Sequence, residues 1–326
     1  MRAVRLREFG PPRVMQWEDV PAPERRDGEV TVAVEAFGVN FADTMVRRGE
    51  YRRDQPLSFT PGFEVAGRVL EAPDGGPSPG TRVAVFTNDG GGYAETIVAP
   101  RSQVCVVPDD VPATVAASLL IQGVTGWYAV HRFGRVAPGE WVLVHGAAGG
   151  LGAMCVELVA AAGGRAIGAA STAEKRSIAM RHGAEATIDS DPSTLAAAVR
   201  ELTVAGCDAV IDGVGGPVFA PSMRALAHSG RYLVVGSASQ QPAMLDVRAL
   251  MPRGQTVIGV LVARVTERDP AEPQAAFDEV VALWREGRLA PDVTVVGPDD
   301  IVAAHERIEA REHTGKVVVD LAGASA

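Results

Sequence analysis

The sequence has few cysteines, and none of them is paired. Cys105, Cys155 and Cys207 are spread along the chain without a CxxC pair. Disulfide frameworks and cysteine-based zinc sites need paired or closely spaced cysteines. We therefore expect neither, and we interpret all three as buried or incidental thiols.

Long runs of one residue character are also missing. The formal net charge is −9 and no run of Lys and Arg exceeds two residues, so nucleic acid is not expected as a partner. The N-terminal segment MRAVRLREFGPP carries charges every few residues, unlike a signal peptide. No uninterrupted apolar stretch approaches the about 18 residues of a membrane helix. We expect no membrane association and a cytoplasmic protein.

The sequence does have enough apolar residues for two cores. Of its 326 residues, 47% are hydrophobic and 22% are charged, as in typical globular domains. Single cores stop growing near about 250 residues, so this length predicts two domains.

The pattern of the chain changes near residue 118. Before it, short alternating strands such as 30–34 are separated by Gly and Pro clusters, which indicates a mostly antiparallel β domain. Over 118–257, apolar strands alternate with Ala-rich helical stretches, the pattern of a parallel sheet covered on both faces. Residues 258–326 hold an amphipathic stretch and a closing strand, and we assign them with 1–117 to the first domain.

A glycine-rich turn joins a strand to a helix in the second domain. The strand is predicted at 141–145, the turn GAAGGLG at 146–152 and the helix at 153–162. This order is the context of a dinucleotide fingerprint, whose glycines let the backbone approach a pyrophosphate at a helix N-terminus. The spacing departs from GxGxxG because an alanine stands where that pattern has its first glycine. The residues expected to bind the phosphates are Ala148, Gly149, Gly150, Leu151 and Gly152.

The end of the next strand, predicted at 165–170, distinguishes the two nicotinamide cofactors. An NAD enzyme usually has Asp or Glu there for the ribose hydroxyls, but this strand runs through alanines into Ser171. Lys175 and Arg176 follow, and together with Ser171 they suit a 2′-phosphate. We therefore predict NADP(H) as the cofactor. The alternative is that Ser171 and Glu174 form a capping box and that Lys175 is a solvated helix residue.

The whole chain resembles the medium-chain dehydrogenase/reductase family, and within it the quinone oxidoreductases related to zeta-crystallin. The motifs that show the resemblance follow the family order: GVNFADTMVRRGEY at 38–51, PGFEVAGRV at 61–69, GGGYAETIVAP at 90–100, GVTGWYAV at 123–130, VHGAAGGLG at 144–152, DGVGG at 212–216 and TGKVVVD at 314–320. The resemblance implies an α/β fold with a GroES-like β domain and a Rossmann domain, an active site in the cleft and a homodimer.

The resemblance also allows a test for zinc. Zinc-dependent members take ligands from a Cys in the segment matching GVNFADT, from the His of a GHE motif, and from a Cys or Asp near the start of the cofactor domain. This chain has Asn40 and Phe63 at the first two positions and no Cys near Gln122. Zinc needs three or four converging N, S or O ligands, so we predict no metal site.

Without a metal, reducing an activated acceptor is easier than oxidising an alcohol. We therefore expect hydride transfer from NADPH to a quinone or an α,β-unsaturated carbonyl. The resemblance makes Asn40, Asp43 and Tyr51 candidate catalytic residues, with Asn40 on the substrate oxygen or cofactor amide and Tyr51 as a proton donor. Alternatively, Asn40 holds a turn and Asp43 caps a helix. Met45, where relatives often carry Tyr, predicts a more apolar pocket.

Further residues are expected to border the cofactor. They come from the helix entering the second domain, from two strand ends and from the return to the first domain: Thr125, Gly213, Val214, Gly215, Gly236, Ser237, Val260 and Leu261. His145 is interpreted as a strand-end histidine held by backbone, and the other five histidines as surface or helix residues.

Two other functions remain open. An enoyl-thioester reductase acting on acryloyl-CoA or a similar acyl carrier would use basic residues at a pocket mouth. Arg47, Arg48, Arg52 and Arg53 are candidates for that role, unless they form only a solvated basic loop. A cofactor-binding protein without turnover is the third candidate, because fold does not determine function.

Overall fold

The computed structural model describes residues 1–51, 57–268, 271–321 and 323. The chain divides into two compact units. Unit 1 comprises Met1–Ile121, Ala263–Phe277 and Asp292–Ala326, and unit 2 comprises Gln122–Val262 and Asp278–Pro291. The boundaries expected at 117/118 and 257/258 fall near two of these divisions. The segment from Asp278 to Pro291, expected in the first domain, groups instead with unit 2.

Unit 1 is built on a mostly antiparallel sheet of seven strands. Their order is β14, β15, β3, β4, β5, β7, with β6 also pairing with β3. The strands are β3 (Glu29–Val39), β4 (Glu64–Glu71), β5 (Arg82–Phe86), β6 (Thr96–Pro100), β7 (Val104–Val106), β14 (Val293–Val296) and β15 (Lys316–Asp320). A separate antiparallel pair is formed by β1 (Arg2–Leu6) and β2 (Met15–Asp19).

The alternation in the sequence explains this sheet. Over residues 29–36 of β3, side chains alternate between half-buried and buried, as expected for a strand with one face on a core. The buried face joins a cluster that includes Val32, Val65 and Val85. The strand β15, from the C-terminal part of the chain, pairs antiparallel with β3, so both chain ends contribute to unit 1. Helices α1 (Phe41–Arg47) and α9 (Ile301–Glu309) lie side by side.

Unit 2 is a parallel six-stranded sheet. Its order is β10, β9, β8, β11, β12, β13, and every pairing is parallel. The strands are β8 (Trp141–His145), β9 (Arg165–Ala170), β10 (Ala186–Asp189), β11 (Cys207–Asp212), β12 (Leu226–Val234) and β13 (Thr256–Gly259). Numbered within the unit, the order is 3-2-1-4-5-6, the doubly wound dinucleotide-binding topology.

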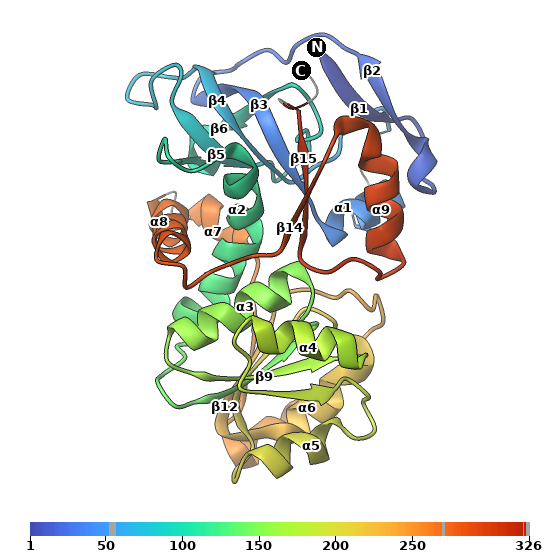
Figure 1. Cartoon of the computed structure of the whole chain (residues 1–326), viewed down its shortest axis with the longest axis vertical. Helices are drawn as coiled ribbons and strands as arrows, with labels where there is room; N and C mark the ends of the chain where they lie inside the picture. Colours follow the sequence, from blue (N-terminus) through green and yellow to red (C-terminus); the bar gives the residue numbers. More distant parts are fainter. Residues whose placement is uncertain (52–56, 269–270, 322, 324–326) are drawn as a thin grey trace. The chain divides into compact units, whose positions relative to one another are not determined.

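Helices cover both faces of this sheet, as Figure 1 shows. Ile167 and Ala169 of β9 pack in one cluster with α5 (Leu195–Leu202) and α6 (Phe219–Ala225). The residue between them, Gly168, lies instead against Ala179 of α4 (Ala173–Arg181). Strands with both faces buried must be apolar throughout, which explains the continuous apolar strands of the sequence. The predicted fold class, a GroES-like β domain with a Rossmann domain, is confirmed.

The remaining helices follow the strands or link the units. They are α2 (Ala113–Trp127), which continues as a π-helical turn at Tyr128–Phe133, α3 (Gly150–Ala161), α7 (Val262–Arg268) and α8 (Ala271–Arg285). Short 3-10 turns lie at Pro12–Val14, Arg101–Gln103, Gly216–Val218, Val247–Arg253 and Pro298–Asp300.

Candidate active site

The glycine turn of unit 2 is a sharp connection between β8 and α3. Gly146 has a positive φ of 63°, which glycine adopts without strain, and its carbonyl accepts the N–H of Gly149 at 2.8 Å. A Cβ on Gly152 would lie 2.1 Å from the Gly146 carbonyl oxygen. Counted as Gly146, Gly149 and Gly152, the turn therefore has a GxxGxxG spacing. The sharp turn depends on Gly146, a residue that the sequence analysis left out of the binding set.

The turn lies at the point where the strand order reverses. Strand β8 has β9 on one side and β11 on the other, and ligands of such sheets bind beyond the carboxyl ends of the strands at this point. The first N–H groups of α3 lack partners within the helix and favour an anion there. The predicted phosphate-binding residues, Ala148 to Gly152, thus form a helix N-terminus at the topological switch of the sheet.

Two further strand-end loops adjoin this turn. A Cβ on Gly146 would lie 3.8 Å from Val214, in the loop after β11. That loop is tied to the one after β12, because Ala238 donates to the Gly213 carbonyl at 2.9 Å and Ser239 donates to the Val214 carbonyl at 2.8 Å. The fold therefore brings the predicted residues around 213 and 236 together at one edge of the sheet.

Asp212 shapes the first of these loops and was missed by the sequence analysis. Its buried carboxylate accepts the backbone N–H groups of Val214 at 2.7 Å and Gly215 at 3.0 Å, and the Tyr232 hydroxyl at 2.5 Å. These N–H groups are therefore engaged by the protein itself and are not donors for a phosphate. The signal in the sequence was an acid at a strand end followed by two glycines, which is typical of a side-chain-stabilised turn.

The end of β9 differs from its predicted details. The N-cap of α4 is Thr172, whose hydroxyl accepts the Lys175 N–H at 3.2 Å, so the capping box considered for Ser171 and Glu174 is wrong. Ser171 is exposed and Lys175 is half-buried at the start of the helix. Arg176 donates to Asp189 at 2.8 Å. Of the two predicted cations, Arg176 is thus held by an acid at the end of the neighbouring strand.

The other predicted cofactor residues of unit 2 lie on α2 and after β13. Thr125 is buried on α2. Gln122, one turn earlier, packs against the start of α3, since a Cβ on Gly150 would lie 2.2 Å from its amide nitrogen. After β13, Val260 is buried and bonded to the Val234 carbonyl, whereas Leu261 is about half exposed. Residues three apart share a helix face, so Thr125 and Gln122 lie on the side of α2 nearest the glycine turn.

In unit 1, Asn40 lies in a network of buried charges. Its side-chain oxygen accepts from Lys316 Nζ at 2.8 Å and its amide nitrogen donates to Glu64 Oε1 at 2.9 Å. Lys316 and Glu64 also form an ion pair with each other, and their side chains are 1% and 0% exposed. The backbone, not the side chain, of Asn40 serves the N-terminus of α1. Asn40 is therefore positioned by tertiary contacts and does not simply hold a turn.

Asp43 caps α1 and is fully buried. Its carboxylate accepts the Asn40 N–H at 2.8 Å, which agrees with the capping alternative of the sequence analysis. Burial raises the pKa of Asp43 to about 7, although the Asn40 N–H and the charge of Lys316 oppose this. Burial, and next the neighbouring Asp43 carboxylate, raise the pKa of Tyr93 well above its ordinary value. The buried Asp43 carboxyl can therefore hold a proton near neutral pH, whereas an exposed aspartate is ionised there.

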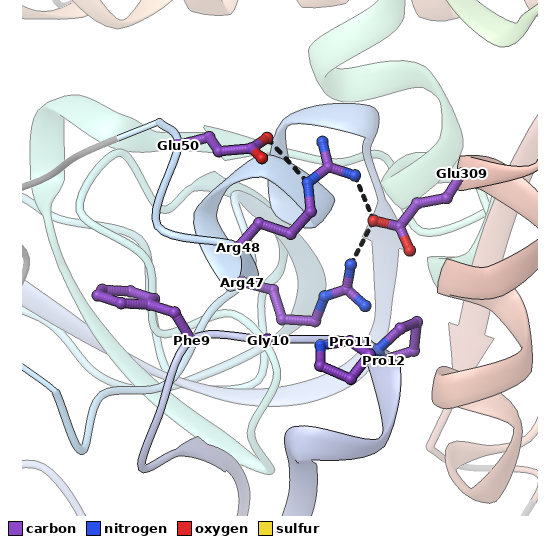
Figure 2. A pocket seen from close by; sticks show the side chains of 8 residues that line it. All are labelled: Phe9, Gly10, Pro11, Pro12, Arg47, Arg48, Glu50 and Glu309. Atoms are coloured by element: carbon purple, nitrogen blue, oxygen red, sulfur yellow. Dashed lines mark hydrogen bonds and ion pairs between the residues drawn. The ribbon is translucent and has the colours of Figure 1, made fainter.

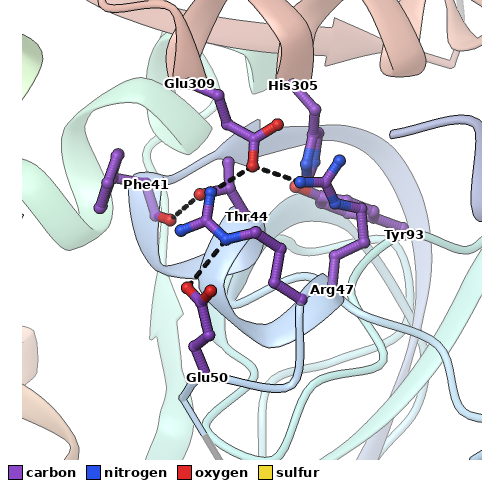
Figure 3. Close-up of polar contacts among 8 residues, drawn as sticks. Phe41, Thr44, Arg47, Glu50, Tyr93, His305 and Glu309 are labelled. Carbon is purple, nitrogen blue, oxygen red and sulfur yellow. Dashed lines mark hydrogen bonds and ion pairs between the residues drawn. The ribbon is translucent and has the colours of Figure 1, made fainter. Parts of the chain in front are cut away.

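A second set of contacts joins α1 to α9. Figure 3 shows the Tyr93 hydroxyl beside His305, 3.1 Å from its Nε2, and Arg47 bonded to Glu309. Burial lowers the pKa of His305 to about 3. The buried His305 is thus a neutral hydrogen-bonding partner on a helix and not a surface residue. His182, the C-cap residue of α4, is also buried and is bonded to Glu157 at 2.7 Å.

Two of the arginines expected at a pocket mouth, Arg47 and Arg48, are paired with acids. Arg47 is wholly buried, and both Arg47 and Arg48 donate to Glu309. Arg48 also donates to Glu50 at 2.8 Å. They line an open pocket of about 480 Å³, drawn in Figure 2, together with Phe9, Gly10, Pro11 and Pro12. Two acids neutralise two arginines here, so a solvated basic loop is wrong for Arg47 and Arg48. Arg52 and Arg53 lie outside the described residues.

Comparisons with known proteins agree with this architecture. Residues 26–109 match the model of the alcohol dehydrogenase GroES-like domain and 150–282 that of the zinc-binding dehydrogenase. A quinone oxidoreductase-like protein 2 homolog from Nematostella vectensis is 32% identical over 98% of this chain and 88% of its own length.

Solved structures give the same result. A mycobacterial protein in complex with NADPH is 34% identical, has a TM-score of 0.91 and covers 98% of this chain and 100% of its own. A quinone oxidoreductase from Pseudomonas syringae pv. Tomato is 29% identical, with a TM-score of 0.91 and coverage of 98% and 99%. The chain belongs to the medium-chain dehydrogenase/reductase family, in its quinone oxidoreductase branch.

Zinc-dependent members of the medium-chain dehydrogenase/reductase family differ from this chain at the metal position. Asn40 is bonded to the ammonium group of Lys316, and a cation at that point opposes a second cation. Phe63 packs on Tyr51 with ring centroids 5.4 Å apart and offers no ligand atom. The described part of the chain has no group of three or more His, Cys, Asp or Glu that could hold a metal. The residues present do not fit a catalytic zinc ion.

His145 and the three cysteines, which the sequence also singled out, have structural roles. His145 is buried and hydrogen-bonded to the Ser222 hydroxyl at 2.8 Å, so its partner is a side chain and not backbone. The three cysteines are buried and unbridged, as predicted.

Residues Ala113–Phe133, which include α2, are long and apolar enough to cross a membrane, but 72% of the most apolar window is buried inside the protein, as in a core helix.

Proposed function

We propose that this chain is an NADPH-dependent reductase that transfers a hydride to a quinone or an α,β-unsaturated carbonyl compound without a metal ion. The observation that supports it most combines two features of unit 2. A glycine turn lies at the topological switch, and the next strand, β9, lacks a ribose-binding acid at its end and is followed by Lys175. The cofactor assignment agrees with the mycobacterial neighbour, whose structure contains NADPH.

Within unit 2, the N-terminus of α3 would bind the pyrophosphate, and the residues Ser171 and Lys175 would bind the 2′-phosphate. Arg176 would add charge from the position that Asp189 gives it. Thr125, Val214, Ser237 and Leu261 would line the rest of the dinucleotide. A charge-assisted contact to a phosphate is stronger than one to a neutral hydroxyl, so the 2′-phosphate would favour NADPH over NADH.

Within unit 1, Asn40 would bind the carbonyl oxygen of the acceptor. The nicotinamide of NADPH, when bound, supplies the hydride. Negative charge then develops on the acceptor oxygen, and a fixed N–H donor lowers the energy of that state. Asp43, with a pKa of about 7, would supply the proton, or Tyr51, whose side chain is 42% exposed, would do so from the loop after α1.

The test is an NADPH oxidation assay with a panel of quinones, enones and enoyl-thioesters, repeated with NADH. The proposal expects turnover with a quinone or an enone and a higher kcat/KM for NADPH than for NADH. Turnover of enoyl-thioesters alone would favour the alternative function. That alternative has weaker support, because Arg47 and Arg48 are already neutralised by Glu309 and Glu50. NADPH binding without any turnover would indicate a binding protein.

We also propose a homodimer, as the family resemblance implies. Light scattering on the purified protein tests this, and a mass of one chain, 34.0 kDa, would contradict it.

A further inference from the structure

The orientation of the Asn40 side chain is determined by its two partners. A lysine ammonium group only donates hydrogen bonds, so the Asn40 atom 2.8 Å from Lys316 Nζ must be the oxygen. An ionised carboxylate only accepts, so the atom 2.9 Å from Glu64 must be the nitrogen. Both partners require the same orientation. The flip ambiguity of an ordinary asparagine is therefore absent here.

This orientation leaves one hydrogen for a ligand. The amide nitrogen has two hydrogens, of which one is used by Glu64, and the second meets no acceptor among the described residues. The amide oxygen accepts from the Lys316 ammonium group. The second N–H of Asn40 is therefore a hydrogen-bond donor that can bind a carbonyl oxygen of a bound molecule.

The surrounding structure is built to hold these partners. The second oxygen of Glu64 accepts the Ile121 N–H at 2.8 Å, which fixes the carboxylate. A Cβ on Gly38 would lie 2.4 Å from Glu64 Oε1 and 2.7 Å from Lys316 Cε, so only glycine leaves room for the pair beside β3. The chain contains only two lysines, Lys175 and Lys316. An arginine at position 316 would be bulkier and planar, and Lys316 already approaches Gly38 closely.

We propose that Glu64 and Lys316 are positioning residues, which hold the Asn40 amide in the orientation whose second N–H donates to the carbonyl oxygen of the acceptor. This inference rests on the proposed function for the identity of the ligand, but the orientation itself does not depend on turnover.

The first experiment measures the orientation of the Asn40 amide and does not depend on enzymatic activity. The chain has only two asparagines, Asn40 and Asn88, so protein labelled with ¹⁵N-asparagine gives two side-chain amide signals, which Asn88→Asp assigns. We expect one Asn40 amide proton to be shifted downfield and to exchange with water at least about tenfold more slowly than in the charge-balanced variant E64Q/K316M. Equal exchange in both proteins would overturn the positioning role.

The second experiment measures how loss of the Glu64–Lys316 pair changes reduction of the acceptor. We expect E64Q/K316M to lower kcat/KM for the acceptor about five- to tenfold, the effect of one hydrogen bond, with the Kd for NADPH unchanged. Asn40→Ala should cause a similar loss, and the triple variant should lose no more than either, because residues that act as a unit are not additive. A loss that appears in the NADPH Kd, or that adds to that of Asn40→Ala, would contradict the proposal.

The matched control is R47M/E309Q, which neutralises another buried ion pair on unit 1 without touching Asn40. Its effect on kcat/KM should be smaller and should add to that of Asn40→Ala, and an equal, non-additive loss would show that loosening of α1 explains both. If the wild type reduces none of the quinones, enones or enoyl-thioesters, the proposed function fails, and the amide exchange experiment still decides whether Glu64 and Lys316 orient Asn40.

Discussion

Arg176 donates to Asp189 at 2.8 Å and to the Ala170 carbonyl at 3.1 Å, so its guanidinium is held between the ends of β10 and β9. Part of the Arg176 charge is thus balanced by a carboxylate before any phosphate binds. The sequence alone suggested that the two adjacent cations, Lys175 and Arg176, would share a phosphate. In the structure, Arg176 is already bonded to Asp189, and it would contact a phosphate from that position.

We therefore expect Lys175→Ala to weaken NADPH binding roughly 5- to 150-fold, the effect of a charge-assisted hydrogen bond of ~1 to 3 kcal/mol. NADH binding should hardly change, and the double change of Lys175 and Arg176 to Ala should exceed either single one. Both cofactors are titrated into each variant at one salt concentration. Arg181→Ala, which removes an exposed cation from the last turn of α4, is the control. Equal losses for NADH and NADPH would show that Lys175 supports the fold.

Asp43→Asn should change how stability depends on pH. The folded pKa of Asp43, about 7, exceeds its ordinary value of 3.8, so the native state holds the proton more tightly than the unfolded chain. The free energy of unfolding of the wild type should therefore fall as pH rises from about 4 to about 7. Asparagine does not titrate, and its amide oxygen can still accept the Asn40 N–H.

The stability of Asp43→Asn relative to wild type should thus increase over that pH range by at most about 4 kcal/mol, and then stay constant. Urea unfolding at a series of pH values measures this. The groups that face Asp43 are Lys316, Glu64 and Tyr93, and all three are unchanged in the variant. Parallel curves for the two proteins would mean that Asp43 is ionised throughout.

Gly152→Ala should disturb the glycine turn itself. Its Cβ would lie 2.1 Å from the Gly146 carbonyl oxygen, so the turn must move, and overpacking of this kind costs ~1 to 3 kcal/mol. NADPH and NADH should both bind more weakly, and by the same factor, in contrast to Lys175→Ala. Thermal unfolding and cofactor titration check this. Gly297→Ala, whose Cβ has no neighbour closer than 3.8 Å, should be nearly neutral.

Zinc should be substoichiometric in the purified protein, and activity should survive a strong chelator. The reason is that Lys316 binds Asn40 and that Phe63 has no ligand atom. For the same reason, simple primary alcohols should not be oxidised at a rate comparable with enone reduction, because no metal lowers the alcohol pKa. Elemental analysis that finds one zinc per chain would contradict this prediction.

Local patterns were sufficient for much of the fold. The strands at 141–145 and 165–170 were predicted with the bounds that the structure shows, because a strand buried on both faces must be apolar throughout and is then recognisable by itself. The capping role of Asp43 was also open to the sequence, since a cap acts within three residues of its partner. The helix after the glycine turn began three residues earlier than expected, at Gly150.

Contacts between distant residues were decided only by the tertiary structure. Glu64 and Lys316 are 252 residues apart, and no periodicity links them, yet together they determine which way Asn40 points. The partner of Arg176 lies on a neighbouring strand, and that of Arg47 on α9. The sequence by itself determined the parallel sheet, the glycine turn and the missing acid, because each depends on neighbours in the chain. Which polar groups remain available to a ligand depends on what each buried charge pairs with, and burial brings those partners together from any distance along the sequence.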